Sequence, residues 1–393
     1  MQPHHQATVL PEKPAEAKSI RIFFPNLDGL RFFCFLSVFF FHSFGSSKVD
    51  ITDHVLHKTV RQFLFKNGVL GVNFFFVLSG FLITYLLLVE KEKFKSINVL
   101  NFYKRRILRI WPLFFFCVLF GFAIFPQIKI LFGEVPNEPA RLGMYLSFLS
   151  NLDIVYNSSP DSSVLAILWS VSIEEQFYLV WPLIILLSPR KWLLPALLTL
   201  ILASLAFRLA NADSYLKMTL HTFSCFSDLV VGGVFAYLAL YSERFISAIR
   251  NAPKITWIGL YVVVIVLYLF TRNIFQQQPV LYAFERLVIS IAFAFVIIEQ
   301  CYASHSLFKM SNYPTISRLG TYTFGLYCLH PIGGLIANKG LGLFGLNSNV
   351  YTIMFLETFV SFAISVALAV FSYRFFESPF LRMKDKFARI KKA

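Results

Sequence analysis

The chain has 393 residues, of which 57% are hydrophobic and only 15% are charged, and 47 of them are Phe. This composition, with a mean hydropathy of +0.64, argues against a set of soluble domains and is typical of a polytopic membrane protein. Lys and Arg outnumber Asp and Glu by 36 to 21, and the excess gathers in short segments between apolar runs. We therefore expect the basic residues to orient the chain in a membrane and not to bind nucleic acid.

A helix that spans a bilayer needs roughly 20 apolar residues, and the sequence predicts an all-α, polytopic transmembrane bundle of about ten spans. The predicted spans are 27–47, 68–89, 107–127, 167–188, 191–208, 222–241, 255–271, 282–301, 316–337 and 351–375. Basic residues concentrate in alternate connections, which predicts that both termini are cytoplasmic. The first run lacks the cleavage pattern of a signal peptide, so we expect none to be removed.

The chain then divides into a polar N-terminal segment (1–24), a transmembrane domain (25–380) and a basic tail (381–393). The longest connection, 128–166, holds the semi-apolar piece RLGMYLSFLSNLDIVY, which is too polar for a span. We expect an outer loop there, with an interfacial or re-entrant helix over the site.

The five cysteines lie singly in or beside apolar runs and form no CxxC or other metal-ligand spacing. They are Cys34, Cys117, Cys225, Cys301 and Cys328. The sequence therefore predicts neither disulfides nor a metal site.

Three ionisable residues fall on nearly one face of the first span: Asp28, Arg31 and His42. Arg31 and His42 are eleven residues apart, which is about three helical turns and roughly 16 Å along the axis. A lone histidine in a membrane helix often hydrogen-bonds a neighbouring helix, but a stripe of three such groups favours a functional site.

The second span holds a small-residue notch at Ser79 and Gly80, which indicates either close helix packing or a place in the site. The third span opens with FYKRRILRIWP. Its Arg105, Arg106 and Arg109 either anchor the helix at the inner surface or bind a phosphorylated ligand, and the depth of Arg109 favours the ligand.

The fourth span, LWSVSIEEQFYLVWP, carries two adjacent carboxylates, Glu174 and Glu175. Ser170, Glu174 and Tyr178 recur at i, i+4 and i+8, so one helix face carries a hydroxyl, a carboxylate and a phenol. A carboxylate stabilised by the helix macrodipole and interfacial water is the plain alternative, but a polar face inside an apolar run predicts a cavity.

Two later spans add polar groups whose roles stay open. Asp228 either joins the same cavity or packs beside Gly232 and Gly233. His330 precedes Pro331, where a hydrogen bond that stabilises a kink is as good an explanation as catalysis.

The predicted arginines lie near the inner face of the membrane, whereas His42 and Glu174 lie in its outer half. This arrangement suits a protein that takes an anionic substrate from inside and reacts it outside. His titrates near neutrality, and a carboxylate on its other nitrogen would fix its tautomer. No GxSxG nucleophile motif is present. The pair could deprotonate an acceptor hydroxyl that attacks a thioester on a phosphorylated carrier such as coenzyme A, or His42 could carry the acyl group itself. A proton-coupled transporter or flippase, and a receptor or scaffold, are the alternatives.

The blocks NLDGLRFFCFLSVFFFH, GVNFFFVLSGFLIT, FYKRRILRIWP, LWSVSIEEQFYLVWP and ESP, in this order, resemble acyltransferase family 3, the membrane-bound O-acyltransferases that modify bacterial surface polysaccharides. The resemblance implies a ten-helix core, a bacterial inner membrane location, and acyl-CoA, with acetyl-CoA expected, as donor substrate in place of any tightly bound cofactor. It implies His42 as catalytic base and Glu174 as its partner, with Arg31 and the Arg105, Arg106 and Arg109 group on the donor side. We also expect Ser79 to lie on the donor side. We expect Asp28, Ser170, Tyr178, Asp228 and His330 to support these groups.

Two departures from the family pattern matter. Asn73 stands where many members have Asp, so no role is carried over to it. The sequence stops soon after the last span, so we expect no fused extracytoplasmic domain. The expected acceptor is a glycan or lipid-linked sugar, which the loops, a second copy of the chain or a separate extracytoplasmic partner would present.

Overall fold

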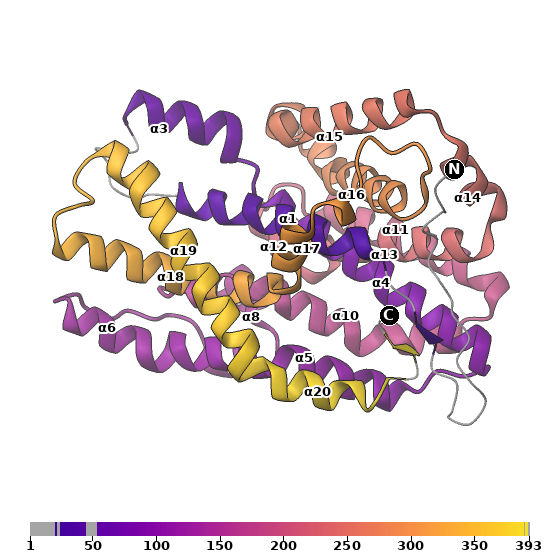
Figure 1. Ribbon diagram of the computed structural model, residues 1–393, viewed down its shortest axis with the longest axis horizontal. Helices are drawn as coiled ribbons and strands as arrows, with labels where there is room; N and C mark the ends of the chain where they lie inside the picture. The colour runs from indigo at the N-terminus through magenta and orange to yellow at the C-terminus, as the bar shows by residue number, and fades with distance from the viewer. Residues whose placement is uncertain (1–19, 22–23, 45–52, 389, 392–393) are drawn as a thin grey trace.

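The computed structural model describes residues 20–21, 24–44, 53–388 and 390–391, and these residues are mainly helical (Figure 1). Among them, eight helical segments are long and apolar enough to cross a membrane. They are Val55–Phe94, Val99–Leu131, Ser163–Leu187, Arg190–Ala210, Tyr215–Tyr241, Lys254–Phe275, Pro279–Tyr302 and Thr352–Asp385. The prediction of an all-α polytopic bundle is thus confirmed, whereas most of the predicted N-terminal segment and the end of the tail lie outside the described residues.

Two further helices overlap the first and ninth predicted spans: α1 (Pro25–Ser43) and α18 (Thr323–Leu343). The ninth span was predicted to begin at 316, but residues 316–321 belong to the separate helix α17 (Pro314–Thr321). The 19 residues of α1 and the 21 residues of α18 suffice in length, but polar side chains interrupt their apolar sequence. These polar groups include His42 on α1 and His330 on α18, which are the two histidines that the sequence analysis selected. The two candidate histidines therefore lie on long helices that fall short of the apolar length of a span, as expected where a polar site interrupts a membrane helix.

The other long helices are α4 (Leu70–Phe94), α5 (Val99–Leu119), α10 (Leu168–Leu187), α11 (Arg190–Ala210), α13 (Thr222–Tyr241), α15 (Lys254–Phe275), α16 (Pro279–Tyr302) and α19 (Thr358–Phe371). Shorter helical pieces are α3 (Val55–Val60), η1 (Arg61–Phe65), η2 (Phe120–Ile124), α6 (Phe125–Leu131), α7 (Leu142–Leu146), α8 (Ser150–Tyr156), α9 (Ser163–Ala166), α12 (Tyr215–Leu220), α14 (Glu243–Asn251), η3 (Met310–Asn312), α17 (Pro314–Thr321), η4 (Thr352–Glu357), η5 (Ser372–Glu377) and α20 (Ser378–Asp385). Two short strands, β1 (Ile20–Arg21) and β2 (Ile390–Lys391), pair in parallel and hold the described ends of the chain together.

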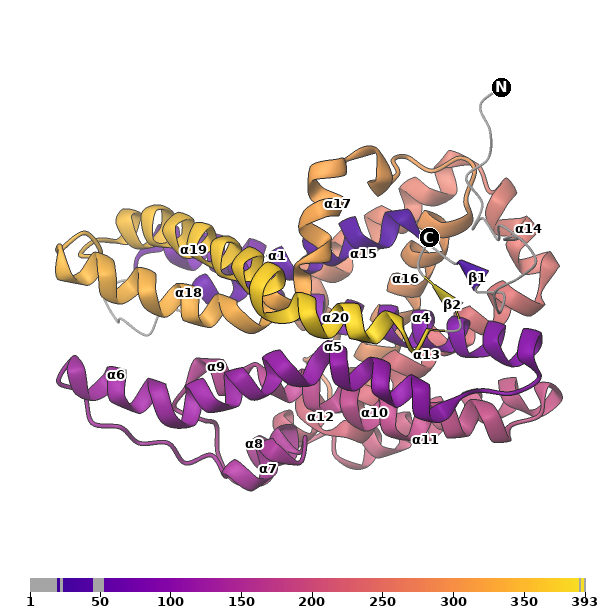
Figure 2. The same ribbon diagram turned by 60° about the horizontal axis from the view of Figure 1, so that its bottom comes forward.

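The bundle has two ends, which we name by their side chains. The histidine end is the one where His42 lies in the last turn of α1. The arginine end is the one where α5 begins, with Arg105 and Arg106 in its second turn. The β1–β2 pair and α14 lie at the arginine end, whereas α3, α6 and the start of α19 lie at the other (Figures 1 and 2). Both described chain ends therefore lie on one side of the bundle.

One very close helix crossing joins α4 and α13 at the centre of the core. A Cβ added to Gly80 would lie 1.9 Å from the backbone oxygen of Leu229, and one added to Gly232 would lie 2.0 Å from that of Val77. Only glycine allows two helix backbones to approach so closely. The predicted packing role of the small-residue notch is thus confirmed at Gly80.

Large apolar side chains on the outside of the bundle are exposed along α11 and α15. Examples are Leu198, Leu202, Val262, Val263 and Ile265, each more than 40% exposed. A continuous apolar exterior of this kind suits contact with lipid acyl chains and not with water.

The long connection between α5 and α10 differs from the single helix expected over 141–156. It forms two short helices, α7 and α8, because Phe148 between them adopts a left-handed conformation with φ 56°. The ring of Phe148 inserts against α5, with centroids 5.3 Å from Trp111 and 4.5 Å from Phe114. Aromatic packing therefore breaks the helix and fixes this loop on the bundle.

Candidate active site

A pair of histidines, His42 from the last turn of α1 and His330 from the interior of α18, forms the first part of the site. The Nδ1 atom of His42 on α1 lies 2.8 Å from Nε2 of His330 on α18. Their rings are nearly parallel, at 15°, with centroids 5.0 Å apart. His330 is buried against the rings of Phe35 and Phe39, whereas His42 is exposed. A substrate could therefore reach His42 but not His330.

The hydrogen bonds of His330 determine which nitrogen of His42 is free. The Nδ1 atom of His330 lies 2.7 Å from the backbone oxygen of Tyr327. A carbonyl oxygen only accepts, so this Nδ1 carries the proton of the neutral ring and Nε2 is an acceptor. The Nδ1–H of His42 then donates to that Nε2, which leaves the lone pair of its own Nε2 free. This is the tautomer that a general base requires.

The carboxylate of Glu174 forms the second part of the site, deeper in the bundle. Its Oε1 accepts a hydrogen bond of 2.6 Å from Ser79 on α4, and its Oε2 accepts one of 3.2 Å from Tyr178, one turn further along α10. The structure thus gives Ser79 and Gly80 separate roles, since Ser79 contacts the carboxylate and Gly80 contacts α13.

The structure differs here from the expectation that Glu174 pairs with His42. Glu174 lies six residues after the start of α10, roughly 9 Å along the helix axis, whereas His42 lies in the last turn of α1. The nitrogen that we had assigned to Glu174 contacts His330 instead. Sequence reasoning placed both groups in one half of the bundle but could not resolve this difference in depth.

Ser170 and Tyr327 connect the carboxylate region to the histidine pair. The hydroxyl of Ser170 lies 2.6 Å from that of Tyr327, and both contact the backbone oxygen of Ile167. Tyr327 also supplies the carbonyl that holds His330. Sequence analysis did not select Tyr327, although it precedes His330 by three residues and so lies one turn away on the same helix.

Glu175, the second carboxylate, points to a different helix. Its Oε2 accepts a 2.8 Å hydrogen bond from the indole of Trp111 on α5, and its buried Oε1 has no partner among the described residues. The two adjacent glutamates therefore face different neighbours, as successive positions of a helix must.

Arginines gather below Glu174, towards the arginine end. Arg31 forms an ion pair with Asp28 on α1, as their spacing suggests. Arg106 lies over the ring of Tyr178, 5.6 Å from its centroid, and the buried Nε of Arg106 has no hydrogen-bond partner within the described residues. Arg109 is exposed and interacts electrostatically with Arg31, Arg106 and Glu174. Clustered guanidinium groups with an unused buried N–H indicate a site for an anion.

Arg105 lies beside Arg106 but also has partners of its own. Arg105 donates a hydrogen bond of 2.8 Å to the backbone oxygen of Phe387 and lies 3.8 Å from Glu90. It therefore attaches α5 to the C-terminal segment and to the end of α4.

Asp228 takes part in a separate buried network. Its Oδ2 lies 3.2 Å from Nε of Arg286 on α16 and 3.1 Å from Nδ2 of Asn73, and its Oδ1 accepts a 2.7 Å hydrogen bond from Ser290. Asp228 and Arg286 are both buried, so the pair neutralises charges inside the core. Sequence analysis missed Arg286, which stood unremarked inside the eighth predicted span.

Together these features define a class of protein: a polytopic membrane protein with a polar path of hydroxyl, carboxyl and imidazole groups between an arginine cluster and an accessible histidine. The chain belongs to acyltransferase family 3, whose acyltransferase domain matches residues 24–374. The resemblance seen in the sequence blocks is thereby confirmed.

Several bacterial proteins are similar to this chain. It is 27% identical over 325 residues to the peptidoglycan O-acetyltransferase OatA of Listeria monocytogenes, which covers 79% of this chain and 49% of that protein. It is 26% identical over 377 residues to YrhL of Bacillus subtilis, covering 91% of this chain and 55% of that protein. The O-acetyltransferase OatA of Staphylococcus aureus is 33% identical over 167 residues, or 42% of this chain and 25% of that protein.

The chain thus spans about half the length of the first two relatives. No solved structure matches it.

Proposed function

We propose that this protein is a membrane O-acetyltransferase that moves an acetyl group from acetyl-CoA to a hydroxyl of a cell-envelope glycan. The observation that carries the proposal is the free Nε2 of His42, which its contact with His330 leaves unprotonated at an accessible position. The family and the names of the relatives support acetyl transfer to an oxygen, and two of those names specify peptidoglycan.

In this mechanism the acceptor donates its hydroxyl proton to Nε2 of His42 as its oxygen attacks the acetyl carbonyl. The carbon–sulfur bond of the thioester then breaks, and the leaving thiolate takes the proton back from the imidazolium. If His42 instead carries the acetyl group for part of the cycle, the same Nε2 is the attacking atom. Both routes need the tautomer that His330 holds.

The arginine cluster suits the other end of the donor. Coenzyme A carries its phosphates far from its thioester, at the end of the long pantetheine arm. Arg31 and His42 lie eleven residues apart on one helix, roughly 16 Å along the axis. Phosphates near Arg106 and Arg109 would therefore allow the thioester to approach the histidines, past Glu174 and Ser170. We propose that the arginine end is cytoplasmic, since basic residues surround it and acetyl-CoA is a cytoplasmic metabolite.

The test is acetyl transfer by purified protein in lipid, with radiolabelled acetyl-CoA and an envelope glycan extract. We expect label in the glycan with wild type and none with His42→Ala. His305→Ala is the control, because His305 is another exposed histidine but lies at the arginine end. Full activity of His42→Ala would refute the mechanism, and movement of unmodified substrate across the lipid without acetylation would indicate a transporter instead.

A further inference from the structure

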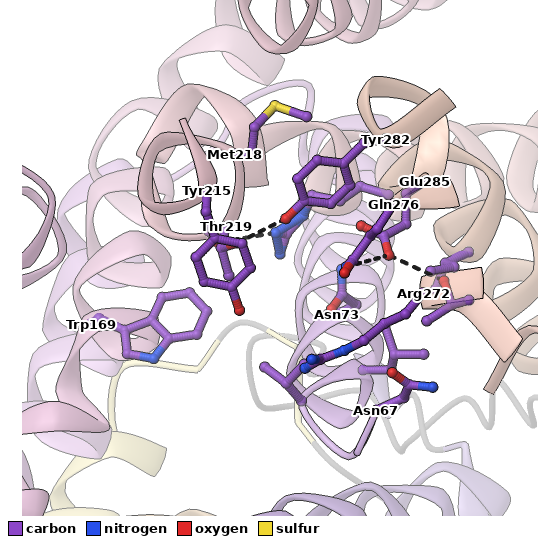
Figure 3. Close-up of a pocket in the computed structure, with 15 residues that line it drawn as sticks. Asn67, Asn73, Trp169, Tyr215, Met218, Thr219, Arg272, Gln276, Tyr282 and Glu285 are labelled. Atoms are coloured by element: carbon purple, nitrogen blue, oxygen red, sulfur yellow. Dashed lines mark hydrogen bonds between the residues drawn. The ribbon is translucent and has the colours of Figure 1, made fainter. Parts of the chain in front are cut away.

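A second polar site opens at the histidine end, on the other side of α4 from the histidine pair. It is a pocket formed where α12, α15 and α16 meet the beginnings of α4 and α10. Figure 3 shows the rings of Trp169 and Tyr215 on one side of this pocket, with Asn67, Arg272 and Gln276 on the other. None of these residues contacts the histidine pair or Glu174 through a hydrogen bond within the described part of the chain.

Several polar atoms in this pocket remain available to a ligand. Among the described residues, both hydrogen bonds to the Glu285 carboxylate, from Thr271 and Gln276, use Oε1, so Oε2 can accept from a ligand. Asn67 donates from Nδ2 to the backbone of α15, so its amide oxygen is also unused within the described residues. The hydroxyl of Tyr215 can donate, because this side chain is 57% exposed.

This combination of groups matches the surface of a sugar ring. A pyranose presents hydroxyls around its edge, which both donate and accept, and C–H groups on its faces, which pack on the negative faces of aromatic rings. The pocket supplies aromatic rings from two elements opposite acceptors and donors from others, and concave sites with a few convergent polar groups are the usual ligand sites. A phosphate would fit less well, since Arg286 is already paired with Asp228, Arg272 already donates to the backbone oxygen of Lys66, and Glu285 repels anions.

The pocket adjoins the histidine pair through two of its walls. Asn67 precedes Gly68, and a Cβ at Gly68 would lie only 2.6 Å from Cβ of Phe41, the residue before His42. Trp169 precedes Ser170, which contacts Tyr327. The beginning of α4 therefore lies between the pocket and His42, so a ring bound here is not the reacting sugar, and a glycan that reaches both passes over this end of α4.

We infer that this pocket binds one sugar ring of the acceptor glycan, at a short distance along the glycan from the ring that is acetylated. The inference rests on the proposed function for the identity of the ligand, but the binding itself needs no acetyl donor. A glycan of several linked sugars then reaches both the pocket and His42, and the ring in the pocket adds to the affinity of the glycan without reacting.

The experiment measures binding of a tetrasaccharide of N-acetylglucosamine to the full chain in lipid nanodiscs by titration calorimetry, without acetyl-CoA. We expect wild type to bind, Tyr215→Ala to bind at least about tenfold more weakly, and Tyr215→Phe to fall between them. Tyr351→Ala is the matched control, since Tyr351 lies at the same end, outside the pocket, and is 58% exposed. Binding should also change the fluorescence of Trp169, and Trp169→Phe should remove that change.

Equal affinity of wild type and Tyr215→Ala, or no binding by wild type, would overturn the inference. CoA release and glycan labelling, measured in parallel, separate this result from the proposed function. If the glycan is acetylated but Tyr215→Ala binds the tetrasaccharide as tightly as wild type, the inference about the pocket is rejected and the proposed function stands. Sugar binding that depends on Tyr215, without any turnover of acetyl-CoA, would support the pocket and reject the reaction.

Discussion

Replacing His330 tests whether this buried ring orients the catalytic one. In the structure, Nε2 of His330 accepts the Nδ1–H of His42 over 2.8 Å, and nothing else among the described residues holds that proton. His330→Phe keeps the ring volume and the packing on Phe35 and Phe39 but cannot accept a hydrogen bond. His330→Gln loses the ring but retains a side-chain oxygen that can accept.

The size of the effect follows from one hydrogen bond. Such a bond contributes about 0.5–1.5 kcal/mol, and about 1.4 kcal/mol corresponds to a factor of ten. We expect His330→Phe to lower kcat about tenfold by freeing His42 to adopt its other tautomer and other rotamers. His42→Ala removes the base itself and should cost about 10²–10⁴-fold. His330→Gln should recover part of the loss.

The assay is the initial rate of CoA release and glycan labelling, over a range of acetyl-CoA concentrations. A positioning role predicts a change in kcat with little change in KM for acetyl-CoA, because His330 lies far from the arginine cluster. Size-exclusion profiles and melting temperatures of the variants exclude misfolding as the cause. An unchanged kcat in His330→Phe, or equal losses in His330→Phe and His330→Gln, would refute the proposed orientation of His42.

Three further predictions concern the groups deeper in the bundle. Glu174→Gln should slow acetyl transfer about tenfold, because its amide nitrogen cannot accept a hydrogen bond as the second carboxylate oxygen does. Glu175→Gln should slow acetyl transfer less. If Glu175→Gln were the slower variant in the same rate assay, the role would belong to Glu175. Arg109→Gln should raise KM for acetyl-CoA with kcat unchanged, and added salt should reduce the difference in KM between this variant and wild type. A KM equal to that of wild type would mean that the phosphates of acetyl-CoA bind elsewhere. Arg286→Met should destabilise the fold by roughly 3–5 kcal/mol, because it leaves Asp228 unpaired. Adding Asp228→Asn should restore part of the lost melting temperature. A double variant that is no more stable than Arg286→Met would argue against the Asp228–Arg286 ion pair.

The sequence predicted the architecture well, because each span depends on local composition. Apolar runs of sufficient length identify membrane helices wherever they lie in the chain. The same rule is weakest for α1 and α18, whose polar groups lower their hydropathy, although both were predicted as apolar runs. The loop over 141–156 was mispredicted because its conformation depends on where the ring of Phe148 packs, which is a tertiary contact.

The candidate site was predicted as a set of residues but not as a set of contacts. Spacing within one helix correctly places Tyr178 beside Glu174 and Asp28 beside Arg31. The partner of His42 is 288 residues away, and the hydroxyl of Ser79 that contacts Glu174 is 95 residues away. Neither contact leaves a local pattern, so composition and periodicity cannot choose between such partners.

The hydrogen-bond chain from His42 to His330 ends at a peptide carbonyl of Tyr327. A peptide oxygen is not protonated at physiological pH, so this series of hydrogen bonds cannot carry a proton away from His42. In the proposed reaction, a proton that arrives on Nε2 of His42 must leave from the same atom, and each turnover returns the ring to its starting state. Such a site recycles one proton locally, which suits group transfer, whereas a proton-driven pump needs separate entry and exit routes on opposite sides of the membrane.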